Sequence, residues 1–128
     1  MAMPKTALEG IRVLDLGRYQ AGPRIGLVLA RLGAEVIKVE APGGDERRSM
    51  GPFVRGQSAY WVQYNSGKKS LGLDMRHEKG KEIIRALVKV SDILIQNFRP
   101  GTIATIGFGY DPLKTLNSRI IMEEISWQ

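Results

Sequence analysis

A glycine-containing turn near the N-terminus occupies the position of a nucleotide-binding loop. Gly17, Gly22 and Gly26 lie between an apolar run and a helix-like run. A dinucleotide fingerprint needs G-x-G-x-x-G, in which two close glycines let the backbone approach a pyrophosphate. That close pair is missing here. Glu40 ends the next apolar run, where an acidic ribose-binding residue would lie, but strand ends often carry a solvated carboxylate. The spacing therefore argues against a dinucleotide.

A second glycine-containing segment has the composition of the end of a P-loop. Gly67 is followed by Lys68, Lys69 and Ser70. The P-loop motif needs another glycine five residues before the last one, and that position holds Val62. A second lysine also separates the first from the serine. The sequence therefore excludes a P-loop.

Few residues could form a metal centre or a nucleophilic site. The chain has no cysteine, which excludes disulfides, thiolate metal sites and a thiol nucleophile. His77 is the only histidine, so neither a zinc cluster nor a catalytic triad is indicated, and we expect His77 to begin a helix. The carboxylates show no spacing that singles out an acid–base pair. These residues alone predict no metal site and name no reaction.

The first elements that must position these residues form a βαβ unit. Residues 11–16 are predicted to form a strand, and residues 36–39 a second strand. Pro23 suits the first turn of the helix between them, and Gly33 suits its C-terminal end. Short connections of this kind imply parallel strands and a right-handed crossover.

A long loop follows over residues 41–57, which are rich in glycine, proline and charge. Loops of this length in compact domains are usually functional or disordered. Residues 58–65 fit either a short helix or an extended segment. Their aromatic side chains are predicted to pack under the loop, with stacking on an adenine as the alternative; they are Tyr60, Trp61 and Tyr64.

The second half of the chain continues the alternation of strands and helices. Strands are predicted over 70–74, 92–96 and 119–126. The clearest helix covers 77–90, with one apolar stripe formed by Ile83, Ile84, Leu87 and Val88. A short helix is expected after residue 101, and another where Asp111 caps and Pro112 enters the first turn. The pattern predicts an open, mostly parallel, Rossmann-like α/β sheet flanked by helices.

Composition limits the possible partners. The chain has 128 residues, which favours one domain, and a net charge of +6. Basic and acidic residues are interleaved, so we expect no nucleic acid partner, although a phosphorylated small molecule fits the charge. No run is long enough to span a membrane, and the first ten residues lack the apolar core of a secretory signal. We therefore expect no membrane partner and a cytoplasmic protein.

Six motifs in fixed order give the sequence a family resemblance. They are LEGIRVLDL (8–16), QAGP (20–23), LGAEVIKVEAPGGD (32–45), NSGKKSLGLDMR (65–76), NFRPG (97–101) and GFGY (107–110). Together they resemble the family III CoA-transferases, a group that includes related α-methylacyl-CoA racemases. The resemblance covers nearly the whole chain.

The resemblance implies a set of site residues. Arg18, Tyr19, Gln20 and Ala21 match positions where the CoA thioester and the acyl group meet, and Gln20 is the expected catalytic polar group because its amide can donate to a carbonyl or an oxyanion. The remaining matches are positions expected to bind CoA. They are Leu73, Arg76, Asn97, Phe98 and Arg99.

The chain also departs from the family pattern. Ala41 and Thr105 stand where several relatives carry arginine, so Arg47, Arg48 or Arg99 would have to supply the missing cations. The final strand has adjacent carboxylates, Glu123 and Glu124, where relatives carry small or apolar residues. Neighbouring strand residues face opposite sides. A sheet covered on both faces would have to bury one of the two carboxylates, which is unfavourable. We therefore expect one face of this strand to be uncovered, or the reading frame to be truncated.

The implied function is transfer of CoA between an acyl-CoA and a carboxylic acid, with no permanently bound cofactor and with a homodimer as the intact assembly. Residues 1–128 would form the N-terminal part of the large CoA-binding domain, incomplete at its C-terminal side. The nucleophilic aspartate would lie downstream, so the chain alone is expected to be inactive. A racemase fragment and a non-catalytic CoA- or nucleotide-binding module are the alternatives.

Overall fold

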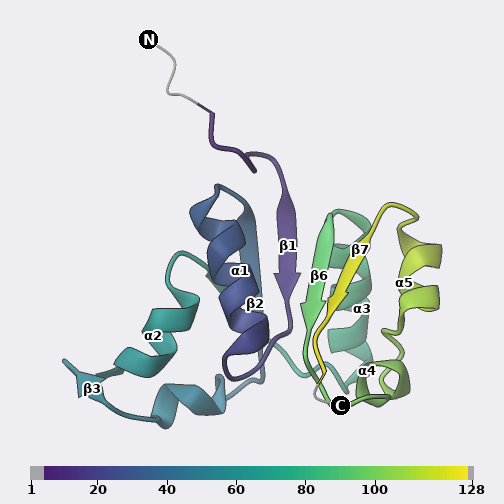
Figure 1. The fold of residues 1–128 in the computed structure, drawn as a ribbon. Helices are drawn as coiled ribbons and strands as arrows, with labels where there is room; N and C mark the ends of the chain where they lie inside the picture. The colour runs from purple at the N-terminus through teal and green to yellow at the C-terminus, as the bar shows by residue number, and fades with distance from the viewer. Residues whose placement is uncertain (1–4, 127–128) are drawn as a thin grey trace.

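A parallel five-stranded sheet forms the centre of the molecule (Figure 1). The computed structural model describes residues 5–126. The sheet has the order β5-β2-β1-β6-β7, and every neighbouring pair is parallel. Its strands are β1 (Arg12–Asp15), β2 (Glu35–Glu40), β5 (Lys69–Gly72), β6 (Ile93–Gln96) and β7 (Ile121–Glu124). The predicted α/β class is confirmed.

The chain changes direction across the sheet at β1. It moves from β1 to β2 and β5 on one side, then returns to place β6 and β7 on the other side. Because the strands are parallel, their carboxyl ends share one edge. Open α/β sheets bind ligands outside that edge, at the point where the strand order reverses. Here this point lies between β1 and β6.

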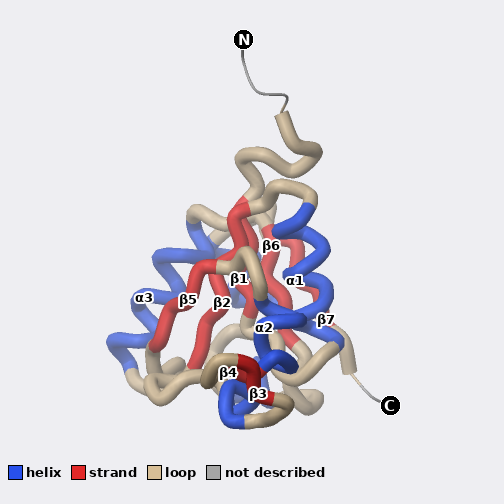
Figure 2. The backbone as a smooth tube through the Cα atoms, turned by 90° about the vertical axis from the view of Figure 1, so that its left-hand side faces the viewer, coloured by secondary structure: helices blue, strands red, loops and turns tan. Residues whose placement is uncertain are grey.

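Helices cover both faces of the sheet (Figure 2). Their bounds are α1 (Ala21–Arg31), α2 (Ala59–Asn65), α3 (Glu78–Lys89), α4 (Thr102–Thr105) and α5 (Tyr110–Leu116). The α1 face has a small apolar core around Val13, Val36 and Ile95. The opposite face has the larger core, in which α3, α4 and α5 contribute buried side chains. Within residues 5–126, no helix has the length and apolar character needed to cross a membrane.

The helices follow local sequence signals with two exceptions, one in a buried stripe and one at a cap. Gly33 ends α1 with φ of 104°, and the His77 side chain accepts a hydrogen bond from the Lys79 amide at the start of α3. The α3 stripe is partly wrong, because Ile83 is 46% exposed whereas its neighbour Ile84 is buried. Consecutive residues lie about 100° apart around a helix, and Ile83 falls beyond the edge of the stripe that Ile84, Leu87 and Val88 turn toward the core.

The second exception lies in α5. Gly109, not Asp111, is the N-cap residue of this helix, and it offers no side-chain cap. The predicted Asp111 cap is therefore wrong: the helix begins one residue before it, which places Asp111 in the first turn. Glu123 and Glu124 on β7 are both exposed. Neighbouring strand residues point to opposite faces, so the sheet is uncovered on both faces at these positions, not on one as predicted.

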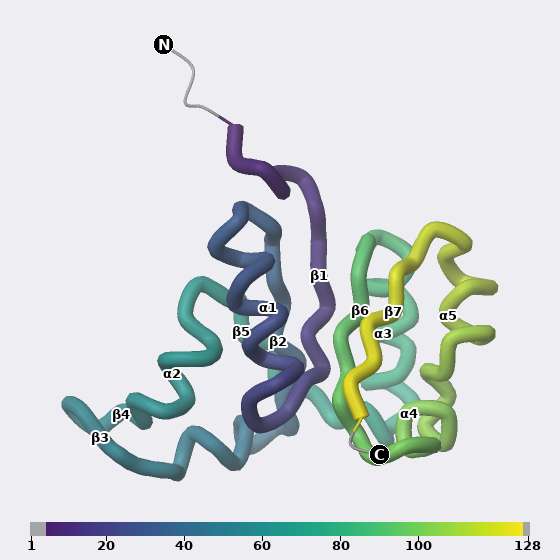
Figure 3. Tube along the Cα trace, in the orientation of Figure 1, coloured from purple at the N-terminus to yellow at the C-terminus, as the bar shows by residue number. Residues whose placement is uncertain are grey.

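The predicted loop contains short elements, and the ambiguous segment after it is helical (Figure 3). The loop includes the 3-10 helix η1 (Glu46–Ser49) and a small antiparallel hairpin of β3 (Phe53–Val54) and β4 (Gln57–Ser58). The Ser58 hydroxyl accepts a hydrogen bond from the Trp61 amide and so caps α2. This cap selects a helix over an extended segment.

A buried ion pair ties three separate parts of the chain together. The Lys68 ammonium lies 2.6 Å from the Asp15 carboxylate, and both side chains are almost completely buried. The same ammonium donates to the Pro23 carbonyl at 2.7 Å and to the Asn65 side-chain oxygen at 3.0 Å. Burial lowers the pKa of Lys68, and the Asp15 charge opposes that shift. The end of β1, the start of α1 and the segment before β5 are thereby fixed.

Replacing Lys68 by methionine should strongly destabilise the fold. Lys68→Met leaves the Asp15 carboxylate buried without its cation, which lowers the free energy of unfolding by about 3 kcal/mol. The matched control is Lys69→Met, because Lys69 pairs with Glu35 from a side chain that is 70% exposed. That variant should lose about 0–1 kcal/mol. Urea denaturation measures both, and equal losses would contradict the structural importance of the buried pair.

Candidate functional site

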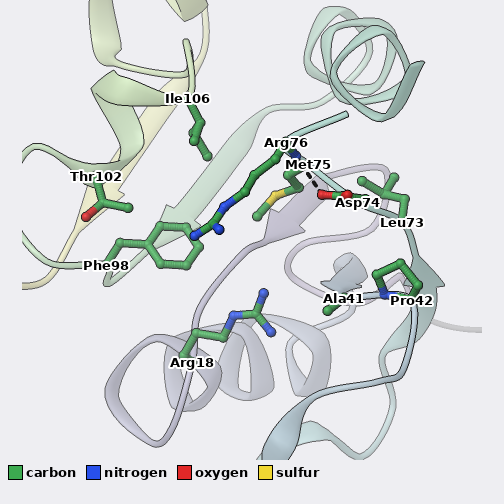
Figure 4. A pocket seen from close by; sticks show the side chains of 10 residues that line it. All are labelled: Arg18, Ala41, Pro42, Leu73, Asp74, Met75, Arg76, Phe98, Thr102 and Ile106. Atoms are coloured by element: carbon green, nitrogen blue, oxygen red, sulfur yellow. Dashed lines mark hydrogen bonds between the residues drawn. The ribbon is translucent and has the colours of Figure 1, made fainter. Parts of the chain in front are cut away.

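Two adjoining pockets open at the carboxyl edge of the sheet, each of about 420 Å³. We call them the Arg76 pocket and the Arg99 pocket. The Arg76 pocket (Figure 4) is lined by Arg18, Ala41, Pro42, Leu73, Asp74, Met75, Arg76, Phe98, Thr102 and Ile106. The Arg99 pocket is lined by Arg18, Tyr19, Ala41, Gly44, Glu46, Asn97, Phe98 and Arg99. Three residues line both pockets and join them into one site; they are Arg18, Ala41 and Phe98.

Parallel topology explains why these residues meet. Arg18 follows β1, Arg76 follows β5, and Phe98 follows β6, so each lies just beyond the carboxyl end of a strand. The site therefore surrounds the point where the strand order reverses. Residues from distant motifs converge here because the sheet brings their strand ends to one edge.

The pockets have a cationic character. Within residues 5–126, the side chains of Arg18, Arg76 and Arg99 form no ion pair with a carboxylate. Figure 4 shows the guanidinium groups of Arg18 and Arg76 pointing from opposite walls into the same space. Arg18 also lies 5.9 Å from the centre of the Phe98 ring. Unpaired arginines around an apolar ring suit an anion that carries a flat organic group.

Each pocket also contains one carboxylate. Asp74 accepts a hydrogen bond from the Arg76 backbone amide at 2.9 Å, which shapes the turn that carries Arg76. Glu46 lies in η1 at the Arg99 pocket. Among the described residues, no cluster of three or more histidine or acidic side chains could hold a metal ion.

The turn after β1 is held by side chains of β1 itself, of β2 and of the segment after β6. The Gly17 amide donates to the Asp15 carboxylate at 2.8 Å, and the Lys38 ammonium donates to the Gly17 carbonyl. The next residue, Arg18, is held by Asn97, whose side chain accepts from its amide at 2.6 Å and donates to its carbonyl at 2.8 Å. Four consecutive backbone polar groups therefore have side-chain partners.

The predicted catalytic residue lies at the margin of this arrangement. Gln20 is exposed, makes no side-chain cap to α1, and lines neither pocket; Ala21, the first residue of α1, also lines neither. Tyr19 adopts a positive φ of 61° and is 47% exposed in the Arg99 pocket. Left-handed backbone is costly for a tyrosine, so the turn must be held by its surroundings. The roles of Gln20 and Ala21 stay predictions.

The arginines that could replace the missing cations differ in availability. Arg48 donates two hydrogen bonds of 2.7 Å to Glu40 and lies 3.5 Å from the Trp61 ring. Arg47 lies 3.8 Å from the Tyr19 ring. Arg99 lines its pocket without an ion pair among the described residues. Because Arg48 lies against its ring, Trp61 packs beneath the loop, as predicted. Of the three arginines, Arg99 is the cation best placed to meet an anion.

Glu40 anchors the loop that forms one wall of the site. Its buried carboxylate accepts hydrogen bonds from Arg48, from Ser70 at 2.8 Å and from the Asp45 amide at 2.8 Å. Burial raises the pKa of Glu40, but these hydrogen bonds, led by Arg48, outweigh it and lower the pKa to about 2. The carboxylate is fully engaged, so it is neither a ribose ligand nor a solvated strand end.

A second buried contact holds the same loop. The Lys38 ammonium lies 3.6 Å from the Asp45 carboxylate, with both side chains buried. Sequence reasoning missed this contact and the Asp15–Lys68 pair. A signal was available in the two apolar strands, because each contains a charged residue: Asp15 in β1 and Lys38 in β2. An unpaired buried charge is unstable, so each of these residues required a partner of opposite charge. The pocket-lining Thr102 and Ile106 of the segment after β6 were also missed.

Neutralising Glu40 should weaken the acid dependence of stability. A folded-state pKa of about 2, against 4.5 ordinarily, contributes stability above pH 4.5 that is lost as the pH falls toward 2. Glu40→Gln should lower the free energy of unfolding by about 1–2 kcal/mol at neutral pH, because solvent screens the 42%-exposed Arg48. When denaturation is measured at a series of pH values, the free energy of unfolding of this variant should fall less steeply with acidification than that of the unchanged protein. The control is Glu123→Gln at an exposed position, and identical slopes in the two variants would refute the role of Glu40.

Comparisons with known proteins place this geometry in a family. The model of "CoA-transferase family III" matches residues 8–127. The chain is 42% identical over 124 residues to a formyl-CoA:oxalate CoA-transferase of Streptomyces coelicolor, covering 96% of this chain and 30% of the relative. It is 43% identical over 116 residues to the human succinyl-CoA:glutarate CoA-transferase, covering 89% of this chain and 26% of the relative.

Solved structures agree with the fold. A crystal structure of Rv3272 from Mycobacterium tuberculosis matches with a TM-score of 0.91 and 40% identity, over 97% of this chain and 35% of that chain. A CAIB/BAIF family protein from Brucella suis matches with a TM-score of 0.88 and 41% identity, over 94% of this chain and 33% of that chain. The chain spans about 30% of the length of the first curated relative. It belongs to CoA-transferase family III.

Proposed function

We propose that the protein transfers CoA between an acyl-CoA and a carboxylic acid, and that residues 1–128 form the N-terminal part of its CoA-binding domain. The observation that carries the proposal is a trio of arginines that form no ion pair within residues 5–126 and line the two pockets that share the Phe98 ring: Arg18, Arg76 and Arg99. CoA presents a diphosphate and a ribose phosphate together with an adenine ring. The cations match the phosphates and the ring matches the adenine.

The proposed roles divide between the two pockets. The Arg76 pocket, with the apolar side chains of Leu73 and Ile106 and the cation of Arg76, would hold the nucleotide end of CoA. The Arg99 pocket, with Tyr19 and Arg99, would receive the diphosphate and the start of the pantetheine arm that leads to the thioester. Gln20 at the adjacent turn would then reach the acyl group and donate a hydrogen bond to its oxygen.

The remaining parts of the proposal rest on the family resemblance. We infer a homodimer, a cytoplasmic location, and acyl-CoA as a substrate with no permanently bound cofactor. The resemblance also assigns the covalent step to an aspartate that follows the segment matching residues 119–126. That carboxylate would attack the thioester carbonyl carbon and release the CoA thiolate, leaving a mixed anhydride.

CoA binding should depend on the pocket arginines. Calorimetry of the 128-residue chain should detect CoA but not NAD. Arg76→Ala and Arg99→Ala should each weaken CoA binding about tenfold, since each removes charged hydrogen bonds to phosphate. The control, Arg31→Ala, removes an exposed arginine at the far end of α1 and should leave affinity unchanged. Tighter binding of NAD, or equal affinities in all variants, would contradict the assignment.

Transfer itself should need the residues that the resemblance places downstream. The purified 128-residue chain, given an acyl-CoA and an isotopically labelled carboxylic acid, should form no labelled thioester above the rate without protein. The turn and pockets of this chain would bind the acyl-CoA, but the resemblance places the carboxylate that attacks the thioester after residues 119–126. Labelled thioester in chromatography would overturn this expectation and assign the nucleophile to a residue of this chain.

A further inference from the structure

We propose that Asn97 is a positioning residue that fixes the backbone of Arg18, and through it the guanidinium shared by the two pockets. The inference rests on the proposed function only for its CoA-binding readout. It gives Asn97 a role that acts through another residue instead of through direct contact with CoA.

The carboxamide of Asn97 extends the sheet beyond the end of β1. The last backbone contact between β1 and β6 is the hydrogen bond from the Leu16 amide to the Ile95 carbonyl, at 2.9 Å. Two residues farther along each strand, Asn97 accepts from the Arg18 amide and donates to the Arg18 carbonyl. An amide side chain carries an NH₂ donor and a carbonyl acceptor in one plane, so it can pair with both the N–H and the C=O of one residue, as the backbone of a neighbouring strand would. The two strand ends are thereby bridged at the point where they would otherwise separate.

Gly22 leaves room for the Asn97 side chain in the turn. A Cβ atom on Gly22 would lie 3.1 Å from the Asn97 side-chain oxygen and 2.9 Å from the Gly17 Cα. The absence of a Cβ on Gly22 therefore allows both the close approach of Gly17 and the position of the Asn97 side chain. Tyr19, the residue after Arg18, holds a positive φ. Strained backbone persists only when neighbouring contacts over-determine it, and the Asn97 bridge is one such contact.

Arg18 depends on this bridge more than a paired arginine would. Within residues 5–126 its guanidinium has no carboxylate partner, so its position is set by its backbone and by the Phe98 ring. The ring is also held, because the Phe98 amide donates to the buried Gln96 side chain at 2.9 Å. A fixed backbone on each side of the crevice keeps the cation over the ring before any ligand arrives, which reduces the ordering that binding requires.

A double-mutant cycle on CoA binding separates positioning from direct contact. Asn97→Ala should weaken CoA binding about tenfold in the otherwise unchanged chain. In an Arg18→Ala background the same change should weaken binding less than about twofold, because the group that Asn97 positions is gone. Equal losses in the two backgrounds would overturn the proposal and indicate that Asn97 contacts CoA itself.

Asn117→Ala is the matched control. The Asn117 side chain donates to the carbonyls of Val88 and Ser91 at 2.9 and 2.8 Å, and accepts from the Arg119 amide at 3.1 Å. Asn117 is half-buried like Asn97 but lines neither pocket. Asn117→Ala should lower stability without changing CoA affinity. If this control lost a similar amount of CoA affinity, the effect of Asn97→Ala would be explained by general destabilisation, and the proposal would be overturned.

Hydrogen exchange of the Arg18 amide tests the bridge without any ligand. Asn97→Ala should speed exchange at Arg18 at least about tenfold, because it removes the acceptor. Asn97→Asp keeps a side-chain oxygen at that place and should preserve slow exchange. Unchanged exchange in Asn97→Ala would overturn the proposal even if CoA binds. If exchange responds as expected but CoA does not bind any variant, the positioning role stands and the proposed function fails.

Discussion

The structure depends on the buried contact between Lys68 and Asp15. A lysine and an aspartate removed from water are unstable apart, and they tolerate burial only when each meets the other with good geometry and further hydrogen bonds. Here the contact is 2.6 Å, and the ammonium has two more oxygen partners. The other carboxylate oxygen of Asp15 accepts from the Gly17 amide. The pair that joins β1 to the segment before β5 therefore also begins the turn that leads to the site.

Pairing of opposite charges recurs around the turn. It distinguishes the cations that stabilise the fold from those that are free to meet a ligand. Lys38 is balanced by Asp45, and Arg48 is balanced by Glu40, so these cations hold loops in place. The arginines that line the pockets have no such partners among the described residues. An anion entering the site would meet a turn whose backbone is already held and cations whose charge is not neutralised within residues 5–126. Electrostatic binding of this kind is strong because little reorganisation accompanies it.

The sequence predicted the repeating elements better than the contacts between them. Apolar runs gave the five parallel strands, and Gly33, Pro23 and His77 marked helix ends correctly, because these signals act over a few residues. The Asp111 cap and the position of Ile83 were wrong, because a shift of one residue changes the face or the cap. The pairing of Asp15 with Lys68 spans 53 residues. Nothing local identifies such a partner, so the anchors of the site emerged only from the fold.

The fold shows where the two departures from the family pattern lie. Ala41 lines both pockets, so an arginine there would have entered the same space as Arg18. A smaller side chain leaves that space open, and Arg99 supplies a cation from the opposite wall, beyond the end of β6. Thr105 lies away from the pockets and donates its hydroxyl to the Gly101 carbonyl. Charge at a binding site is a property of the whole cavity. Cations at different strand ends can therefore act together, because the parallel sheet brings those ends to the same edge.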